Sequence, residues 1–337
     1  MVNKELQLIR EVAGDFPRLP RQINCLFEAD AEIFPVGEGD LVVKIDSVCE
    51  EIGQGLYTDP FLIGWMGVTA AISDIAAVGA EPIGILLSLT INRNLGDIWM
   101  KRFNSGVSAA CSLYHTFVLG GDTNTGASVT VTCTVIAMMS RGKKARLRTS
   151  IKPGDLLFAS GSLGLGNAYA YCKLFDSRFE VDYQPVARLQ EDSRISGFAT
   201  AAIDTSDGLF PALATLSEVN NIGFELEPSL QDMLHPDAAR ISEAAQIPPW
   251  MLLAGPHGEY ELLFAVDPRS RAVLGESGGR YLHIATATSK KELSFSSGLY
   301  PVRCHPNAIA NLFEEARGKI SEYYKLLHRF QREWTIA

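Results

Sequence analysis

The longest apolar stretch of the chain, residues 61–80, carries a single charged side chain, Asp74. Three glycines and the pair Ser73–Asp74 interrupt this stretch, so it would make a poor membrane span. Its pattern, and the glycine at position 79, predict instead a helix over residues 61–78 that is buried in a protein core. A carboxylate in such a helix is costly unless it has a partner. The sequence therefore predicts a folded core with a polar group or a cation beside Asp74.

Composition places the chain among ordinary globular proteins. Hydrophobic residues make up 47% and charged residues 20% of its 337 residues, which is enough for about two domains. The net charge is −9 and the basic residues are scattered, so we expect no nucleic-acid partner. The six cysteines form no CxxC pair, and the first residues lack the apolar segment of a signal peptide. We therefore expect free thiols, a cytoplasmic location and no membrane partner.

Helical and strand patterns alternate along the chain. A basic, polar segment followed by a turn marks a break at residues 146–155. The sequence therefore predicts a two-domain α/β (α+β) protein, with residues 1–150 as the first domain and residues 151–337 as the second. The second domain is expected to end in an amphipathic helical tail over residues 306–333. The clearest patterns predict strands at 41–45, 83–91, 128–139, 156–160, 201–204 and 261–266, and helices at 97–114, 167–175 and 208–219.

Five aspartates follow predicted strands or lie in the apolar helix: Asp46, Asp74, Asp122, Asp204 and Asp207. Taken singly, each has an ordinary interpretation. Asp74 could be a hydrogen-bonded helix residue, Asp122 part of a turn after Gly120–Gly121, and Asp207 the N-cap of the next helix. Taken together, clustered carboxylates without a basic neighbour would repel one another. Mg²⁺ resolves such repulsion because it binds carboxylate and phosphate oxygens at once.

Two further features could bind phosphate. The glycine-rich turn at residues 161–166 precedes a helix, and helix N-termini attract anions, but it lacks the lysine of a P-loop and is favoured as a structural turn. Arg148 could bind phosphate oxygens bidentately, although a single arginine near a linker is often a surface charge. The histidines form no zinc-binding pair.

Five segments, in order, resemble signature motifs of the thiamine-monophosphate kinase family. They are SDIAAVGAEP at residues 73–82, GGDTN at 120–124, RTSIKPGD at 148–155, DTSDGL at 204–209 and EYELLF at 259–264. The wider superfamily includes aminoimidazole-ribonucleotide synthetase and selenophosphate synthetase.

The resemblance implies a homodimer in which the N-terminal domains pair their sheets and hold ATP across the interface. It implies Mg²⁺ ligands at Asp30, Asp46, Asp74, Asp122, Asp204 and Asp207. It implies ATP contacts from Gly120, Gly121, Asp122, Arg148 and Ser206. Asp30 is assigned by the resemblance alone.

Several positions depart from the family's pattern. Lys44-Ile45-Asp46 replaces Ser-Thr-Asp, and we expect the Lys44 side chain to point away from the metal site. Gly53 stands where the family has a histidine that contacts its acceptor. The segment Pro256–Glu259 replaces Gly-Gly-Glu-Asp, and we assign His257 and Glu259 to the acceptor substrate. The nucleotide half of the motif set is therefore largely kept, whereas the acceptor half is altered.

We interpret the chain as an ATP- and Mg²⁺-dependent kinase acting on a small phosphorylated acceptor, with thiamine monophosphate as the first expectation. Catalysis would need no protein nucleophile, because metal ions and positioning carry phosphoryl transfer. Two alternatives stay open. One is a related ATP-dependent enzyme with a different small acceptor, and the other is a nucleotide-binding protein without turnover.

Overall fold

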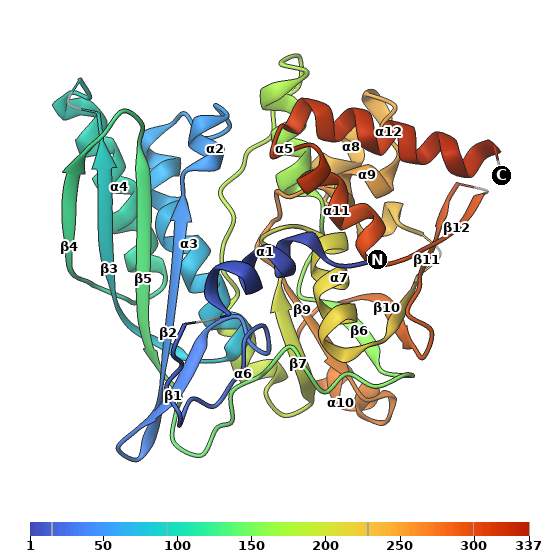
Figure 1. The fold of residues 1–337 in the computed structure, drawn as a ribbon, viewed down its shortest axis with the longest axis horizontal. Coiled ribbons are helices and arrows are strands. Elements are labelled where there is room, and N and C mark those ends of the chain that lie inside the picture. Colours follow the sequence, from blue (N-terminus) through green and yellow to red (C-terminus); the bar gives the residue numbers. More distant parts are fainter. Residues whose placement is uncertain (15, 93, 228, 299, 337) are drawn as a thin grey trace.

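The computed structural model of the chain describes residues 1–336 except 15, 93, 228 and 299. Two sheets form the framework, one on each side of the molecule in Figure 1. The first sheet has the order β1-β2-β5-β3-β4, with β3 and β4 parallel and the other neighbours antiparallel. Its strands are β1 (Glu32–Val36), β2 (Gly39–Val48), β3 (Glu81–Ile91), β4 (Val118–Thr125) and β5 (Thr130–Met138).

Two helices lie on one face of the first sheet: α3 (Pro60–Val78), which packs on β2 and β5, and α4 (Asp97–Leu113), which packs on α3. Asp59 caps α3 by accepting a hydrogen bond from the Phe61 amide, and Gly79 ends it at a φ of 85°. Within the described residues, α3 is the one helix long and apolar enough to cross a membrane, but 89% of that window is buried. The prediction of a buried core helix is confirmed.

The second sheet has the order β12-β11-β8-β10-β6-β9-β7. A core of helices packs on one face, while the end of α3 and two short helices cover the other. The strands are β6 (Leu156–Ala159), β7 (Ala199–Asp204), β8 (Gly223–Leu226), β9 (Leu262–Val266), β10 (Leu282–Thr288), β11 (Leu293–Ser297) and β12 (Tyr300–Cys304). The helices of this part are α5 (Leu165–Leu174), α6 (Asp192–Ile195), α7 (Leu209–Asn220), α8 (Pro236–Ala244), α9 (Pro249–Ala254), α10 (Arg271–Glu276), α11 (Asn307–Glu315) and α12 (Ile320–Ile336).

The N-terminal helix, α1 (Lys4–Ala13), lies between the two halves of the molecule in Figure 1. Asn311 of α11 fixes its first turn by accepting from the Lys4 amide at 3.0 Å and donating to the Val2 carbonyl at 2.8 Å. Although α1 comes first in the sequence, it therefore packs on the second half of the chain. This packing places α1 beside the space between the two sheets.

Two local predictions differ from the structure. The residues Gly120–Asp122, which the sequence indicates could form a turn, belong to β4 because they pair with β3 along its length. The C-terminal tail is two helices, α11 and α12, because Arg317 and Gly318 adopt positive φ values of 52° and 68°. The tail packs on the second half of the chain through Tyr323, which donates to the Ala254 carbonyl at 2.6 Å.

Candidate functional site

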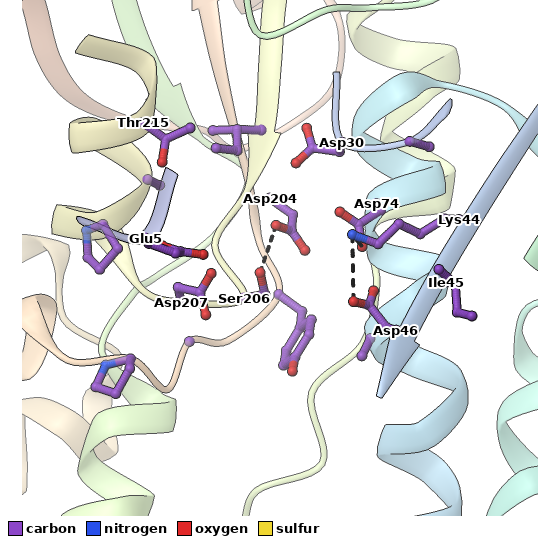
Figure 2. A pocket seen from close by; sticks show the side chains of 18 of the residues that line it. Glu5, Asp30, Lys44, Ile45, Asp46, Asp74, Asp204, Ser206, Asp207 and Thr215 are labelled. Carbon is purple, nitrogen blue, oxygen red and sulfur yellow. Dashed lines mark hydrogen bonds and ion pairs between the residues drawn. The ribbon is translucent and has the colours of Figure 1, made fainter. Parts of the chain in front are cut away.

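A cavity of about 620 Å³ lies between the two halves of the molecule. On one side, the wall of the cavity is formed by β2 and α3. On the other side it is formed by the turn between β7 and α7 and by α1, which packs on the second half of the chain. Figure 2 shows carboxylates projecting into this space from both sides. The cavity therefore gathers acidic residues that are far apart in the sequence.

Three of the predicted metal ligands meet at the centre of this cavity. Asp30, Asp74 and Asp204 each offer one carboxylate oxygen, and these oxygens all lie within 4.8 Å of one another. The three side chains are buried, and Oδ2 of Asp204 has no hydrogen-bond partner within the described chain. Three close carboxylate oxygens, on side chains that include an unpaired buried oxygen of Asp204, fit a hard divalent cation such as Mg²⁺.

The electrostatics of the cluster agree with this fit. Burial and the nearby charge of Asp30 raise the pKa of Asp204 to about 6. Burial in the apolar helix also raises the pKa of Asp74, although the charge of Lys44 opposes the rise. Without a bound cation, the cavity therefore disfavours ionisation of both Asp74 and Asp204.

Asp46 and Asp207 extend the cluster along the cavity. Asp46 comes from β2, while Asp207 lies in the turn before α7 on the opposite wall (Figure 2). Asp207 is not an N-cap, because Gly208 occupies that position of α7 and no side-chain bond caps the helix in the described structure.

The prediction that Lys44 points away from the site is wrong. Its ammonium nitrogen lies 3.2 Å from Oδ2 of Asp74 and 3.6 Å from Oδ1 of Asp46. Residues two apart on a strand share a face, so Lys44 and Asp46 both project from β2 toward α3. Ile45 points to the other side of the strand (Figure 2).

Arg148 and Ser206, which were predicted to contact the phosphates of ATP, also reach the cavity. Arg148 lines it and donates from Nε to Oδ1 of Asp30 at 3.0 Å, with a second bond from Nη2 to the same oxygen. Ser206 lines the opposite wall and donates to Oδ1 of Asp204 at 2.9 Å. Both groups therefore lie beside the carboxylate cluster.

The two residues assigned to the acceptor occupy different positions. His257 lines the cavity, is buried, and its Nε2 has no hydrogen-bond partner among the described residues. Burial lowers the pKa of His257 to about 4, so the ring is neutral. Glu259 lies behind the wall, where it accepts from the Gly164 amide at 2.7 Å and from Oγ1 of Thr205 at 3.0 Å.

Glu259 also explains the glycine-rich turn at residues 161–166. Its carboxylate already occupies the Gly164 amide at the start of α5, which favours the structural interpretation of this turn over a phosphate cradle. Burial raises the pKa of Glu259 to about 8. Glu259 therefore ties the turn before α5 to the turn before α7.

The predicted nucleotide contacts Gly120, Gly121 and Asp122 do not reach this cavity within one chain. They lie on β4, the edge strand of the first sheet, and Oδ2 of Asp122 accepts from Nδ2 of Asn124 at 2.6 Å. Because β5 and β3 separate β4 from β2, the two strands are about 14 Å apart across the sheet.

Sequence reasoning missed an aromatic end of the cavity. Tyr57, Tyr183 and Tyr260 line it, with the rings of Tyr57 and Tyr183 stacked at 6.3 Å between centroids. Glu51, from the short helix α2 (Glu50–Gly53), lines the same cavity. Tyr260 lies inside the recognised segment 259–264, but only the fold brings the other tyrosines to it.

The chain resembles known proteins along most of its length. Residues 28–139 match the family model "AIR synthase related protein, N-terminal domain". The thiamine-monophosphate kinase of Methanospirillum hungatei is 31% identical over 270 residues, covering 78% of this chain and 84% of the relative. That of Bacillus subtilis is 30% identical over 260 residues, covering 73% and 78%.

Solved structures share the fold. AaThiL in complex with AMPPCP and TMP superposes with a TM-score of 0.71 at 20% identity, covering 88% of this chain and 96% of that one. A HypE–HypF complex gives a TM-score of 0.72 at 16% identity, covering 88% and 98%. The two-sheet fold and the matched domain place the chain in the AIR synthase-related class of proteins. The chain is at least 30% identical to the two kinases over more than two thirds of each relative. It therefore belongs to the thiamine-monophosphate kinase family.

Proposed function

We propose that the chain is an ATP- and Mg²⁺-dependent kinase that transfers the γ-phosphoryl group of ATP to thiamine monophosphate in the cytoplasm. The observation that carries the proposal is the buried triad of Asp30, Asp74 and Asp204, whose oxygens lie within 4.8 Å of one another. Family membership supplies the reaction, since the curated relatives are named thiamine-monophosphate kinases.

The metal ligands proposed for this site are Asp30, Asp74, Asp204 and Asp207, with Asp122 from a second copy. Asp46 lies beside them and forms an ion pair with Lys44. Mg²⁺ bound there would neutralise charge on the phosphates and align donor with acceptor. The chain's own residues complete the environment: Arg148 and Ser206 lie beside the cluster, where they can donate hydrogen bonds to phosphate oxygens. The reaction needs no protein nucleophile.

A homodimer would bring the β4 contacts to the nucleotide. Gly120, Gly121 and Asp122 lie at an exposed edge, so they can serve the cavity of a second copy rather than their own. The outer face of the first sheet supports this arrangement, because it carries exposed apolar side chains such as Ile45 and Leu86. We assign dimerisation to the first domain, residues 1–150, and leave residues 151–337 as the second domain.

The aromatic end of the cavity suits the acceptor. Thiamine monophosphate carries a positively charged heteroaromatic ring, which aromatic faces and a carboxylate attract. Tyr57, Tyr183 and Tyr260 supply the faces and Glu51 the carboxylate. The Nε2 of His257, which has no partner among the described residues, is a further contact for the acceptor. In this role His257 would substitute for the acceptor-contacting histidine of the family, whose position Gly53 occupies in this chain.

Calorimetry tests the proposal in two steps. AMPPCP is titrated into the protein with and without Mg²⁺, and thiamine monophosphate is then titrated into the AMPPCP complex. We expect Mg²⁺ to strengthen nucleotide binding at least tenfold (~1.4 kcal/mol) and the acceptor to bind the complex. Equal nucleotide affinity in both conditions, or no acceptor binding, would contradict the proposal.

A further inference from the structure

Lys44 is a positive charge built into the carboxylate cluster. Its ammonium contacts Oδ2 of Asp74 at 3.2 Å and Oδ1 of Asp46 at 3.6 Å, and it thereby joins β2 to α3 (Figure 2). The Lys44 side chain is 23% exposed and that of Asp74 only 8%. Solvent and salt therefore screen this contact less than they screen a surface ion pair.

An ammonium in this position competes with a metal ion for the same oxygens. Mg²⁺ held by both Asp46 and Asp74 needs an oxygen of each at about 2.0–2.1 Å. The Lys44 nitrogen already lies against those two oxygens, so an ion between them would face a like charge at close range.

The competition affects one part of the cluster. The ion pairs of Lys44 engage Asp46 and Asp74, while Asp30 and Asp204 lie on the other side of Asp74. The triad of Asp30, Asp74 and Asp204 still offers three oxygens within 4.8 Å of one another. A cation can therefore bind at the triad while Lys44 stays in its ion pair with Asp46.

We propose that the Lys44 ammonium takes the place of one divalent cation between Asp46 and Asp74, so that this chain binds nucleotide with one metal ion fewer than it would with an uncharged residue at position 44. The inference rests on the proposed function. The Lys44 ammonium forms ion pairs with two carboxylates, at 3.2 and 3.6 Å. Because an ammonium has three donors, it can also donate to a phosphate oxygen, so Lys44 would be both a counter-ion and a phosphate contact.

The test counts bound Mn²⁺ by electron paramagnetic resonance, with and without AMPPCP, in wild type, Lys44→Ser, Lys44→Met and a control. The control is Lys101→Met, because Lys101 is an exposed lysine on α4. We expect both Lys44 variants to bind one more Mn²⁺ per chain than wild type, and the control to match wild type.

Thermal melting gives a second readout that does not depend on activity. Without metal, Lys44→Met should melt about 2–4 °C below wild type because Asp74 loses its buried partner. Mn²⁺ should close that gap, since the ion then replaces the ammonium. Equal Mn²⁺ counts in all four proteins, or a melting deficit that Mn²⁺ does not reduce, would overturn the inference. The Lys44 variants could bind an extra Mn²⁺ while the wild-type protein forms no thiamine diphosphate. That result would support the inference about Lys44 and would contradict only the kinase proposal.

Discussion

At the scale of single residues, Asp204 combines deep burial with a negative neighbour, and both raise its pKa to about 6. In the proposed mechanism it binds Mg²⁺, so Asp204→Asn should lower turnover by at least about 100-fold, as expected when transition-state charge loses its stabilisation. The metal-free melting temperature should hold or rise because the substitution removes one of several like charges. Kinetics and thermal melting check both expectations, with the exposed Asp232→Asn as control. A variant that unfolds even with Mg²⁺ would assign Asp204 a structural role instead.

Glu259 makes a separate prediction about pH. Its pKa is about 8 in the folded protein and about 4.5 in the unfolded chain. Between these values the folded state keeps a proton that the unfolded state has released, so this group's contribution to stability falls as pH rises from 4.5 to 8. Glu259→Gln removes the titration, and the free energy of unfolding of the variant relative to wild type should therefore rise by about 2–4 kcal/mol between pH 5 and pH 8. Urea denaturation at several pH values measures this, and parallel pH profiles would contradict it.

Residue roles were predictable from sequence where a local pattern marks them. Asp46 and Asp204 fall at or near strand ends, and Asp74 stands alone in an apolar helix, so each could be selected before the fold was known. Tyr57 and Tyr183 carry no such mark, because only the approach of distant segments brings them to the cavity. Strand alternation places Lys44 on the same face as Asp46, but only tertiary packing brings Asp74 of α3 to within 3.2 Å of its ammonium, so its ion pair was missed.

At the scale of elements, the approach of α3 to α4 sets the position of Asp74. The helices touch at two glycines: a Cβ on Gly64 would collide with the Phe103 carbonyl, and one on Gly106 with the Phe61 carbonyl. Gly106→Ala should therefore lower the free energy of unfolding by about 1–3 kcal/mol, because backbone cannot yield as a flexible side chain can.

The matched control is Gly275→Ala in α10, where nothing lies within 4 Å of the added Cβ. Alanine there should be neutral or stabilising because it favours helix. Urea denaturation of both variants decides the matter. If Gly106→Ala is as harmless as Gly275→Ala, then the two helices are not held as close as the structure places them.

Most elements were predictable because each has a strong local signal. The core helix ends where predicted, and β5 alternates as its sequence does, with Val131, Cys133 and Val135 buried against the helices. The strand β4 was underestimated because Gly120 and Gly121 indicate a turn locally, whereas pairing with β3 holds them in the sheet. Tertiary pairing overrides local preference at such positions.

At the scale of the whole molecule, the outer face of the first sheet lacks a covering layer within the described chain. Leu86 of β3 is 40% exposed there, and Ile45 of β2 is 62% exposed. The account predicts a dimer, so light scattering should give twice 36.7 kDa. Leu86→Lys should produce monomers, because it places a charge in the apolar interface, and it should weaken nucleotide binding by removing the partner's β4 contacts.

Ile98→Lys is the control for that prediction, since Ile98 is 84% exposed at the start of α4 rather than on the outer face of the sheet. It should remain dimeric. A wild-type protein that is monomeric at micromolar concentration, yet binds nucleotide with Mg²⁺, would contradict the shared site.

Quaternary structure and the acceptor were the parts least accessible from sequence. The alternating pattern of β5 indicates an apolar face that needs a partner, but the structure shows that α3 covers this face within the same chain. The face left open carries a mixture of apolar and hydroxyl side chains, such as Ile136 and Thr134, which local patterns do not distinguish from a solvated surface.

Product analysis tests the central claim most directly. The protein is incubated with ATP, Mg²⁺ and thiamine monophosphate, and ADP and thiamine diphosphate are quantified by liquid chromatography. The account predicts that both products form in equal amounts, that neither forms without Mg²⁺, and that Asp204→Asn forms neither at a comparable rate. ADP released without thiamine diphosphate, or released faster with a different small acceptor, would contradict the assignment of thiamine monophosphate as the substrate.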